Sequence, residues 1–189
     1  MLLAASFMGA VAQDVFRCGE GGGALWYRVL GDGRSVELTH PEAEWPYYGE
    51  AKPRGRLVLP SEVSHDGRLY AVAGVGENAF YRCDGIEEVV LPAGCLYVGV
   101  QAFNGCTSLR SVAFGSRLAE VREGAFAYCT SLAEVELPLS LRKLGISAFA
   151  MCTSLTRVLM SDDARATCNH LTFLGTPIGA GAKNVKNGR

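Results

Sequence analysis

Apolar residues recur through the middle of this chain at a fixed spacing of 23 residues. The clearest marker is Ala-Phe-x-x-Cys, which begins at Ala79, Ala102, Ala125 and Ala148. The positions that keep this spacing hold mainly aliphatic residues, phenylalanine or cysteine: Val75, Val98, Val121 and Leu144; Phe80, Phe103, Phe126 and Phe149; Cys83, Cys106, Cys129 and Cys152; Ile86, Leu109, Leu132 and Leu155; Val89, Val112, Val135 and Val158; and Leu91, Phe114, Leu137 and Met160. A constant period of this length is typical of a repeat protein. Because one repeat cannot bury its apolar side alone, we expect stacked coils and a function carried by a face that several coils share.

Each repeat contains the signal for one strand and one tight turn. The segment Leu109-x-x-Val112-x-Phe114 alternates between apolar and polar positions, which predicts a half-buried strand. Pro92 and Pro138 follow two of these strands and are expected to end them, because proline has no N–H to donate. The Ala-Phe-x-x-Cys portion is too short for a helix and predicts an irregular or 3₁₀-like turn.

The segments on either side of the repeats have other patterns. Residues 13–66 lack the period and predict an N-terminal β cap that covers the open end of the stack. Within this region, runs 24–29 and 34–40 predict one hairpin, and runs 56–60 and 68–73 predict a second strand pair.

The pattern decays after Met160. Residues 161–189 are interpreted as an altered last coil at Leu171 to Leu174, followed by a mobile tail from Gly179 to Arg189.

The first residues form a short apolar run from Leu2 that ends in Ala10-Val11-Ala12. This run predicts a secretory signal peptide over residues 1–12, with a buried first strand of the cap as the alternative. It is shorter than the roughly 20 apolar residues that a membrane-spanning helix needs, and no later run is longer. We therefore expect export without a membrane span.

Composition narrows the range of partners. The chain has 18 basic and 19 acidic side chains, so it has no strong field that would attract nucleic acid. Five of its seven cysteines occupy apolar positions of the repeat, counting Cys95, which shares a position with Val72, Leu118 and Leu141. Equivalent side chains on stacked coils run parallel, which keeps their Cβ atoms too far apart for a good disulfide. Buried thiols are predicted, and Cys18 and Cys168 are expected at opposite ends of the stack.

The repeat resembles the BspA-like branch of the leucine-rich repeat family. The resemblance is carried by Leu-x-x-Val-x-Leu-Pro, a Val-Gly or Leu-Gly turn, and Ala-Phe-x-x-Cys-Thr-Ser-Leu, and it covers residues 67–160. Segments 57–60 and 67–72 are similar to the last two strands of the region that often precedes such repeats. Gly115 replaces one proline and Arg122 replaces one turn glycine of the pattern.

This resemblance implies a right-handed leucine-rich repeat solenoid, mainly β with short irregular or 3₁₀-like turns, 23-residue repeats and an N-terminal β cap. It also implies an exported or cell-surface protein of anaerobic bacteria or parasitic protists that adheres to a protein or glycan on host or neighbouring cells. The family offers no catalytic residues to transfer, and neither a cofactor nor a metal is expected. A structural fragment of a larger surface protein and an enzyme built on the stack are the alternatives.

Three local sequence patterns resemble cofactor-binding or catalytic motifs. Gly74-Val75-Gly76 and the residues after it match a dinucleotide fingerprint, but no helix is predicted to follow. Ser64-His65-Asp66 has the residue types of a triad, yet three consecutive residues cannot align as one. Glu134 and Glu136 have a spacing that suits hydrolytic carboxylates, but they lie where open solvent is expected, which favours a recognition surface.

The predicted binding surface is therefore the concave face formed by the outward positions of the strands. An alternative is that this face has no partner. A loop with Trp45, Tyr47 and Tyr48 is a second candidate, which either anchors a partner or packs on the cap. The candidate partner-binding residues are Glu88, Val90, Ser111, Ala113, Glu134, Glu136, Arg157, Leu159 and Trp45.

Overall fold

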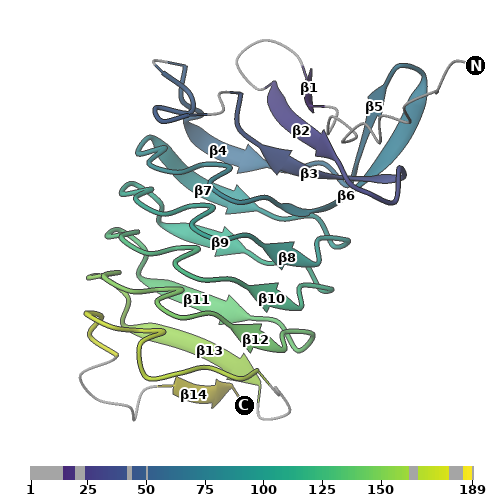
Figure 1. Ribbon diagram of the computed structural model, residues 1–189. Helices are drawn as coiled ribbons and strands as arrows, with labels where there is room; N and C mark the ends of the chain where they lie inside the picture. Colours follow the sequence, from purple (N-terminus) through teal and green to yellow (C-terminus); the bar gives the residue numbers. More distant parts are fainter. Residues whose placement is uncertain are drawn as a thin grey trace, which may run out of the picture.

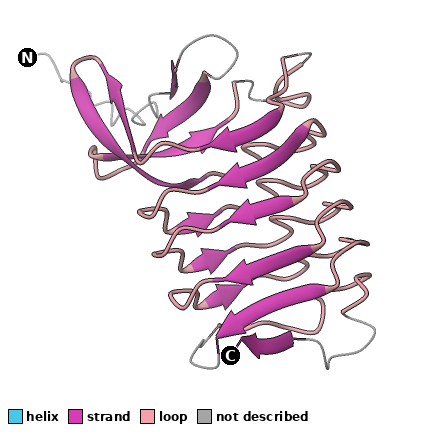
Figure 2. Ribbon diagram, turned by 180° about the vertical axis from the view of Figure 1, so that it is seen from behind, coloured by secondary structure: helices cyan, strands magenta, loops and turns pink. Residues whose placement is uncertain are grey.

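A computed structural model gives the structure of the chain. It describes residues 15–19, 24–41, 44–49, 51–161, 166–178 and 185–188. These residues form strands, bends and turns without any helix, and so contain none that could cross a membrane (Figure 2). The apolar run from Leu2 to Ala12 lies outside the described residues, so the signal-peptide interpretation remains a prediction.

The repeats form a stack in which each coil contributes one long and one short strand (Figure 1). The long strands are β7 (Ile86–Val90), β9 (Ser111–Ala113), β11 (Glu134–Leu137) and β13 (Arg157–Ser161). The short strands are β8 (Tyr97–Val98), β10 (Glu120–Val121) and β12 (Lys143–Leu144). The short strands pair in parallel at the 23-residue offset, as do β7 with β9 and β11 with β13. The predicted solenoid is confirmed.

Phenylalanine and cysteine columns fill the inside of the stack, as predicted. Phe80, Phe103, Phe126 and Phe149 have no exposed surface, and their rings stack at centroid distances of 5.0, 5.2 and 5.4 Å. The four cysteines that follow these phenylalanines by three residues are equally buried, and all seven cysteines of the chain are free thiols. Three donate to a phenylalanine carbonyl of the preceding coil: Cys106 to Phe80 at 3.3 Å, Cys129 to Phe103 at 3.2 Å and Cys152 to Phe126 at 3.1 Å. Three of the four thiols of the cysteine column therefore have a hydrogen-bond acceptor inside an apolar core.

The Ala-Phe-x-x-Cys segment forms tight turns closed by hydrogen bonds between residues three apart, such as Cys83 N–H to the Phe80 carbonyl at 3.1 Å. Neighbouring turns are also bonded to one another, as by Phe80 N–H to the Ala102 carbonyl at 2.7 Å. Two positions of each turn have left-handed backbone, and glycine fills only some of them. These positions are Asn78, Gln101, Gly124 and Ser147, and then Arg82, Gly105, Tyr128 and Met151.

The cap covers the first coil, but one of its predicted strand pairs is wrong. The first three strands pair antiparallel in chain order: β1 (Val15–Cys18), β2 (Leu25–Val29) and β3 (Ser35–Thr39). β3 also pairs in parallel with β6 (Arg68–Val75). The hairpin partner of β6 is β5 (Glu62–His65), not the run 56–60.

The run 56–60 belongs to the repeat sheet instead. β4 (Gly55–Val58) pairs in parallel with β7, with Leu57 opposite Val89. The reason lies in the sequence spacing. Leu57 and Leu59 precede Pro60 by three residues and one residue, as Val89 and Leu91 precede Pro92. Their side chains therefore enter the same core. The stack therefore begins one strand earlier than predicted.

The long-strand sheet is interrupted halfway along the stack. β4, β7 and β9 form one three-stranded sheet, and β11, β13 and β14 form another. The apolar register continues across this break, because Phe103 and Phe126 remain stacked beneath it.

The stack ends in an altered coil. Phe173 stacks on Phe149 at 5.6 Å and follows it by 24 residues, one more than the period. Thr172 and Thr176 stand where alanine and cysteine stand in the other coils, and both hydroxyls donate to backbone carbonyls.

Within the segment for which a mobile tail is expected, the structure places a strand at Val185–Gly188. These residues form β14, which pairs in parallel with β13. Without β14, β13 would present unpaired backbone groups at the edge of its three-stranded sheet. Residues 179–184 and Arg189 lie outside the described part of the chain.

Candidate binding surfaces

The outward side chains of β4, β7, β9, β11 and β13 form one face, which we call the strand face. Strand register places them in two rows. The first row is Arg56, Glu88, Ser111, Glu134 and Arg157, and the second is Val58, Val90, Ala113, Glu136 and Leu159. All eight strand positions predicted from the sequence lie on this face and are at least partly exposed. Arg56 and Val58 were missed because β4 was assigned to the cap, although the Leu-x-Leu-Pro ending of that segment was a usable signal.

The charged side chains of the first row form ion pairs with one another. Arg56 Nε lies 3.1 Å from Glu88 Oε2, and Arg157 Nη1 lies 2.7 Å from Glu134 Oε2. These are exposed pairs, each worth at most about 1 kcal/mol. Because Glu134 is held by Arg157 and Glu136 is open to solvent, the two glutamates form no enclosed acid pair.

The second row is mainly apolar. Val58 is 60% exposed, Ala113 is exposed, and Val90 and Leu159 are half-buried. Glu136 is the one charged residue of this row. An apolar strip beside a row of satisfied charges has the composition of a protein interface, where an apolar centre is bordered by polar groups.

Trp45 lies away from the strand face, in the loop between β3 and β4. Its ring packs edge-on against Tyr47 at 5.8 Å and Tyr81 at 5.4 Å, while Arg82 lies 5.6 Å over it. Trp45 is still 49% exposed. Tyr48 fixes this loop by donating to the Ala79 carbonyl at 2.7 Å. Trp45 thus packs on the first repeat turn and keeps an open face.

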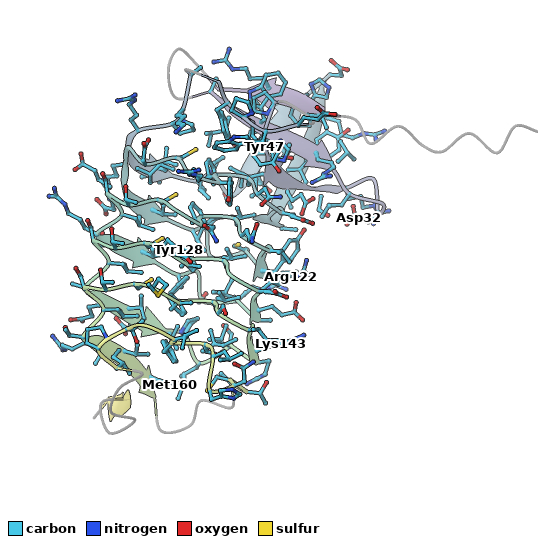
Figure 3. The ribbon with its side chains drawn as sticks, turned by 60° about the vertical axis from the view of Figure 1, so that its left-hand side comes forward. Asp32, Tyr47, Arg122, Tyr128, Lys143 and Met160 are labelled. Atoms are coloured by element: carbon cyan, nitrogen blue, oxygen red, sulfur yellow. The ribbon has the colours of Figure 1, made fainter. Side chains whose placement is uncertain are left out.

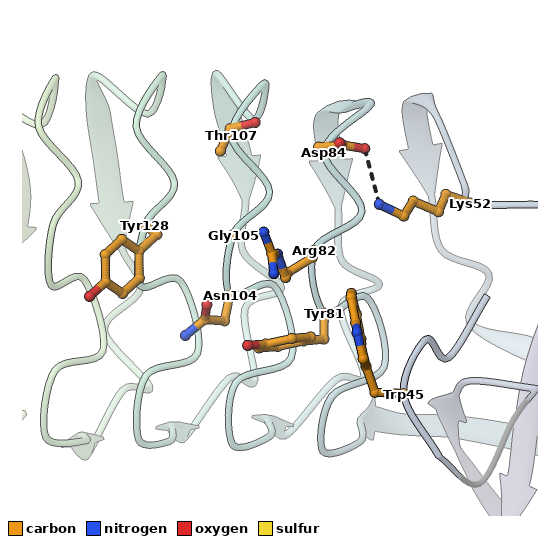
Figure 4. Close-up of a pocket in the computed structure, with 9 residues that line it drawn as sticks. All are labelled: Trp45, Lys52, Tyr81, Arg82, Asp84, Asn104, Gly105, Thr107 and Tyr128. Atoms are coloured by element: carbon orange, nitrogen blue, oxygen red, sulfur yellow. Dashed lines mark ion pairs between the residues drawn. The ribbon is translucent and has the colours of Figure 1, made fainter. Parts of the chain in front are cut away.

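A hollow of about 540 Å³ extends from Trp45 across the turns of the following coils (Figure 4). We call it the turn groove. Its lining residues are Trp45, Lys52, Tyr81, Arg82, Asp84, Asn104, Gly105, Thr107 and Tyr128. Apart from Trp45, the sequence analysis named none of these residues as binding candidates, because most of them occupy outward positions to which the repeat assigns no fixed residue type.

On the flank that carries the short strands, away from the turn groove, side chains join the cap to the stack. Tyr97 donates to Glu37 Oε2 at 2.8 Å, and the guanidinium of Arg122 lies 4.3 Å from the centre of the Tyr97 ring. Burial, followed by the bond to Glu37, raises the pKa of Tyr97 above its ordinary value. In Figure 3, Arg122 and Lys143 lie along the short-strand side, and Tyr128 lies apart from them among the turns.

Close packing on that flank also explains the glycine fingerprint. A Cβ on Gly74 would lie 2.5 Å from the Tyr97 ring, and one on Gly76 would lie 2.7 Å from the Leu38 carbonyl oxygen. These glycines allow close contact within the core, and the segment after them is a turn, not the helix that a pyrophosphate site requires.

Comparisons with known proteins agree with this architecture. The family model of the BspA type leucine rich repeat region matches residues 73–178 in six copies. The solved T. pallidum leucine rich repeat protein is 31% identical with a TM-score of 0.64, over 75% of this chain and 60% of that one. A Bacteroides capillosus leucine-rich repeat protein is 26% identical with a TM-score of 0.59, over 75% of this chain and 96% of that one.

A leucine rich cell surface protein from Faecalibacterium prausnitzii, 21% identical with a TM-score of 0.60, shares the fold over 88% of this chain. This chain spans 48% of that protein, as it spans 60% of the T. pallidum protein. A comparison with curated proteins gives no match.

Proposed function

The chain belongs to the BspA-type leucine-rich repeat family, and from that premise we propose that it is an exported, non-enzymatic binding module for a protein on host or neighbouring cells. The observation that carries the proposal is the exposed apolar row of the strand face beside its self-neutralised charged row. Burying the apolar residues of that row against a partner would provide a favourable free energy, with Glu136 as the one charge of the row that the partner has to pair.

The size of the strand face limits the strength of a single contact. Five strands at about 4.8 Å spacing give a length on the order of 20 Å. A standard interface buries about 800 Å² on each partner, and the strand face supplies only part of that area. We therefore expect modest affinity at one site and firm adhesion when many copies act together.

Export is supported by the apolar run from Leu2 to Ala12, whose small-residue ending suits a cleavage site. Expression in a secreting bacterial host tests this part separately. The mature chain is expected to begin near Gln13, and its recovery with residues 1–12 intact would contradict export by this route.

The binding test starts with a screen of the purified chain against extracellular-matrix and cell-surface proteins. For the partner that the screen identifies, Glu136→Lys should weaken binding about tenfold, because it reverses a charge in the middle of the face. Glu123→Lys makes the same charge change on an exposed turn after β10 and should bind as the wild type does.

Both variants should melt within a degree or two of wild type, since exposed substitutions alter stability by about 0.5 kcal/mol or less. Equal binding by Glu136→Lys and Glu123→Lys would show that the partner does not use the strand face.

A further inference from the structure

The turn groove forms a second site that is separate from the strand face. We propose that it binds a short oligosaccharide, with the sugar rings against Trp45, Tyr81 and Tyr128 and an acidic substituent at Arg82. The groove combines aromatic rings, amide and hydroxyl groups and a cation in one hollow of about 540 Å³. That volume falls within the range of small-molecule sites, roughly 300–1,000 Å³.

The aromatic residues provide stacking surfaces at both ends of the groove. Trp45 and Tyr81 meet edge-to-face at one end, and Tyr128, 52% exposed, lies two coils away (Figure 4). Two steps of about 4.8 Å separate those coils by roughly 10 Å, which suits an oligosaccharide better than a single sugar. The faces of aromatic rings are negative, and they attract the weakly positive C–H bonds on one side of a pyranose ring.

Polar side chains between the rings suit sugar hydroxyls, each of which is both donor and acceptor. Asn104 lies between the Trp45–Tyr81 pair and Tyr128, and its amide offers both functions (Figure 4). Thr107 adds a hydroxyl at the rim. Asp84 pairs with Lys52 at 3.5 Å but stays 61% exposed, so its carboxylate can still accept from a ligand.

The turn backbone is already occupied, which favours a sugar over an extended peptide. The N–H groups of Arg82, Gly105 and Tyr128 donate to carbonyls of the next coil at 2.7, 2.8 and 2.8 Å. A peptide that binds by strand addition needs a free sheet edge, and these turns present none. Recognition in the groove therefore depends on side chains.

Arg82 makes an acidic sugar the preferred ligand. Among the described ion pairs, Lys52 and Asp84 balance each other, and none involves Arg82. Its guanidinium is placed instead over the Trp45 ring at 5.6 Å, with N–H donors left for a carboxylate. A charge-assisted pair of this kind is stronger than a neutral hydrogen bond.

Backbone conformation fixes how these side chains leave the stack. Arg82, Gly105 and Tyr128 occupy the same left-handed position of successive turns, with φ of 54°, 75° and 60°. The repeated conformation therefore directs the side chains of Arg82 and Tyr128 to the same flank. Gly105 also leaves the floor open, since a Cβ there would lie 3.0 Å from Arg82 Cγ.

The test uses the two tryptophans of the chain as reporters. In ¹⁵N NMR spectra of the full chain, the indole N–H signal of Trp45 should move during titration with an acidic probe, sialyllactose or trigalacturonate. The signal of Trp26, in β2, should stay in place as an internal reference. Lactose and cellobiose, as neutral probes, should bind about tenfold more weakly.

Variants then separate binding from folding. Trp45→Ala and Tyr128→Ala should each weaken binding about ten- to thirtyfold, and Trp45→Phe should recover part of it. Arg82→Gln should remove the preference for acidic probes while keeping neutral binding. Glu136→Lys on the strand face should leave sugar binding unchanged, which separates this proposal from the proposed protein-binding function.

Tyr128→Ala is the control for loss of local structure in Trp45→Ala. Tyr128 is exposed and lies on a different coil, so its truncation should weaken sugar binding without disturbing the Trp45 loop. A Trp45 signal that stays in place with every probe at millimolar concentration would overturn the proposal. So would sugar binding that survives both alanine substitutions undiminished.

Discussion

Phe126→Ala tests the internal phenylalanine column that holds the stack together. The Phe126 ring has no exposed surface and contacts Phe103 at 5.2 Å, Phe149 at 5.4 Å and Phe114 edge-on at 5.8 Å. Truncating a buried phenylalanine costs about 3–5 kcal/mol, from lost burial and from the cavity that remains. For a chain of this size each kcal/mol lowers the melting temperature by about 2–4 °C, so we expect a fall of roughly 6–20 °C.

The measurement is thermal and urea unfolding followed by circular dichroism, with two matched variants. Phe173→Ala removes the same ring at the end of the stack, where it is only half-buried and stacks on Phe149 alone among the described rings, so it should cost less than half as much. Phe126→Leu keeps most of the volume but loses the ring contacts and should cost about 1–3 kcal/mol. An end variant as damaging as the central one would refute this account of the column.

Two further predictions concern the buried thiols and the close backbone contacts. Burial raises the pKa of Cys83 to about 12 and of Cys95 to about 11 from an ordinary value of 9.0, so folding keeps these thiols protonated. The free energy of unfolding should therefore fall as pH rises from 9 towards 11, measured by urea titration, and Cys95→Val should reduce that slope. Gly145→Ala places a Cβ 2.5 Å from the Arg122 carbonyl carbon and should destabilise by about 1–3 kcal/mol, whereas Gly94→Ala, with nothing within 4 Å, should leave the melting temperature unchanged.

The sequence alone determined the repeat core. A period of 23 residues dictates which side chains return to the inside of every coil, and burial restricts those positions to residues such as Phe126 and Cys129. The strand positions of the outer face followed from the same register, because residues alternate across a strand. The resemblance to the family rested on these positions and is confirmed by the family model.

Tertiary structure decided the partners of segments whose local pattern fits more than one. The run 56–60 alternates equally well as a hairpin strand or as the first strand of the stack, and only its contact with β7 selects the second. The edge of β13 likewise captures β14, which has no apolar period of its own.

The turn groove could not be predicted from the 23-residue period. Trp45, Arg82 and Tyr128 come from the cap and from two separate coils, at outward positions where burial imposes no residue type. The sequence spaces them 37 and 46 residues apart, and they share one hollow only because stacking returns the chain to the same flank at every coil. The inward positions can thus be predicted from the sequence because burial restricts them to apolar residue types. An outward site, by contrast, forms only when the coils stack and bring residues from separate coils together.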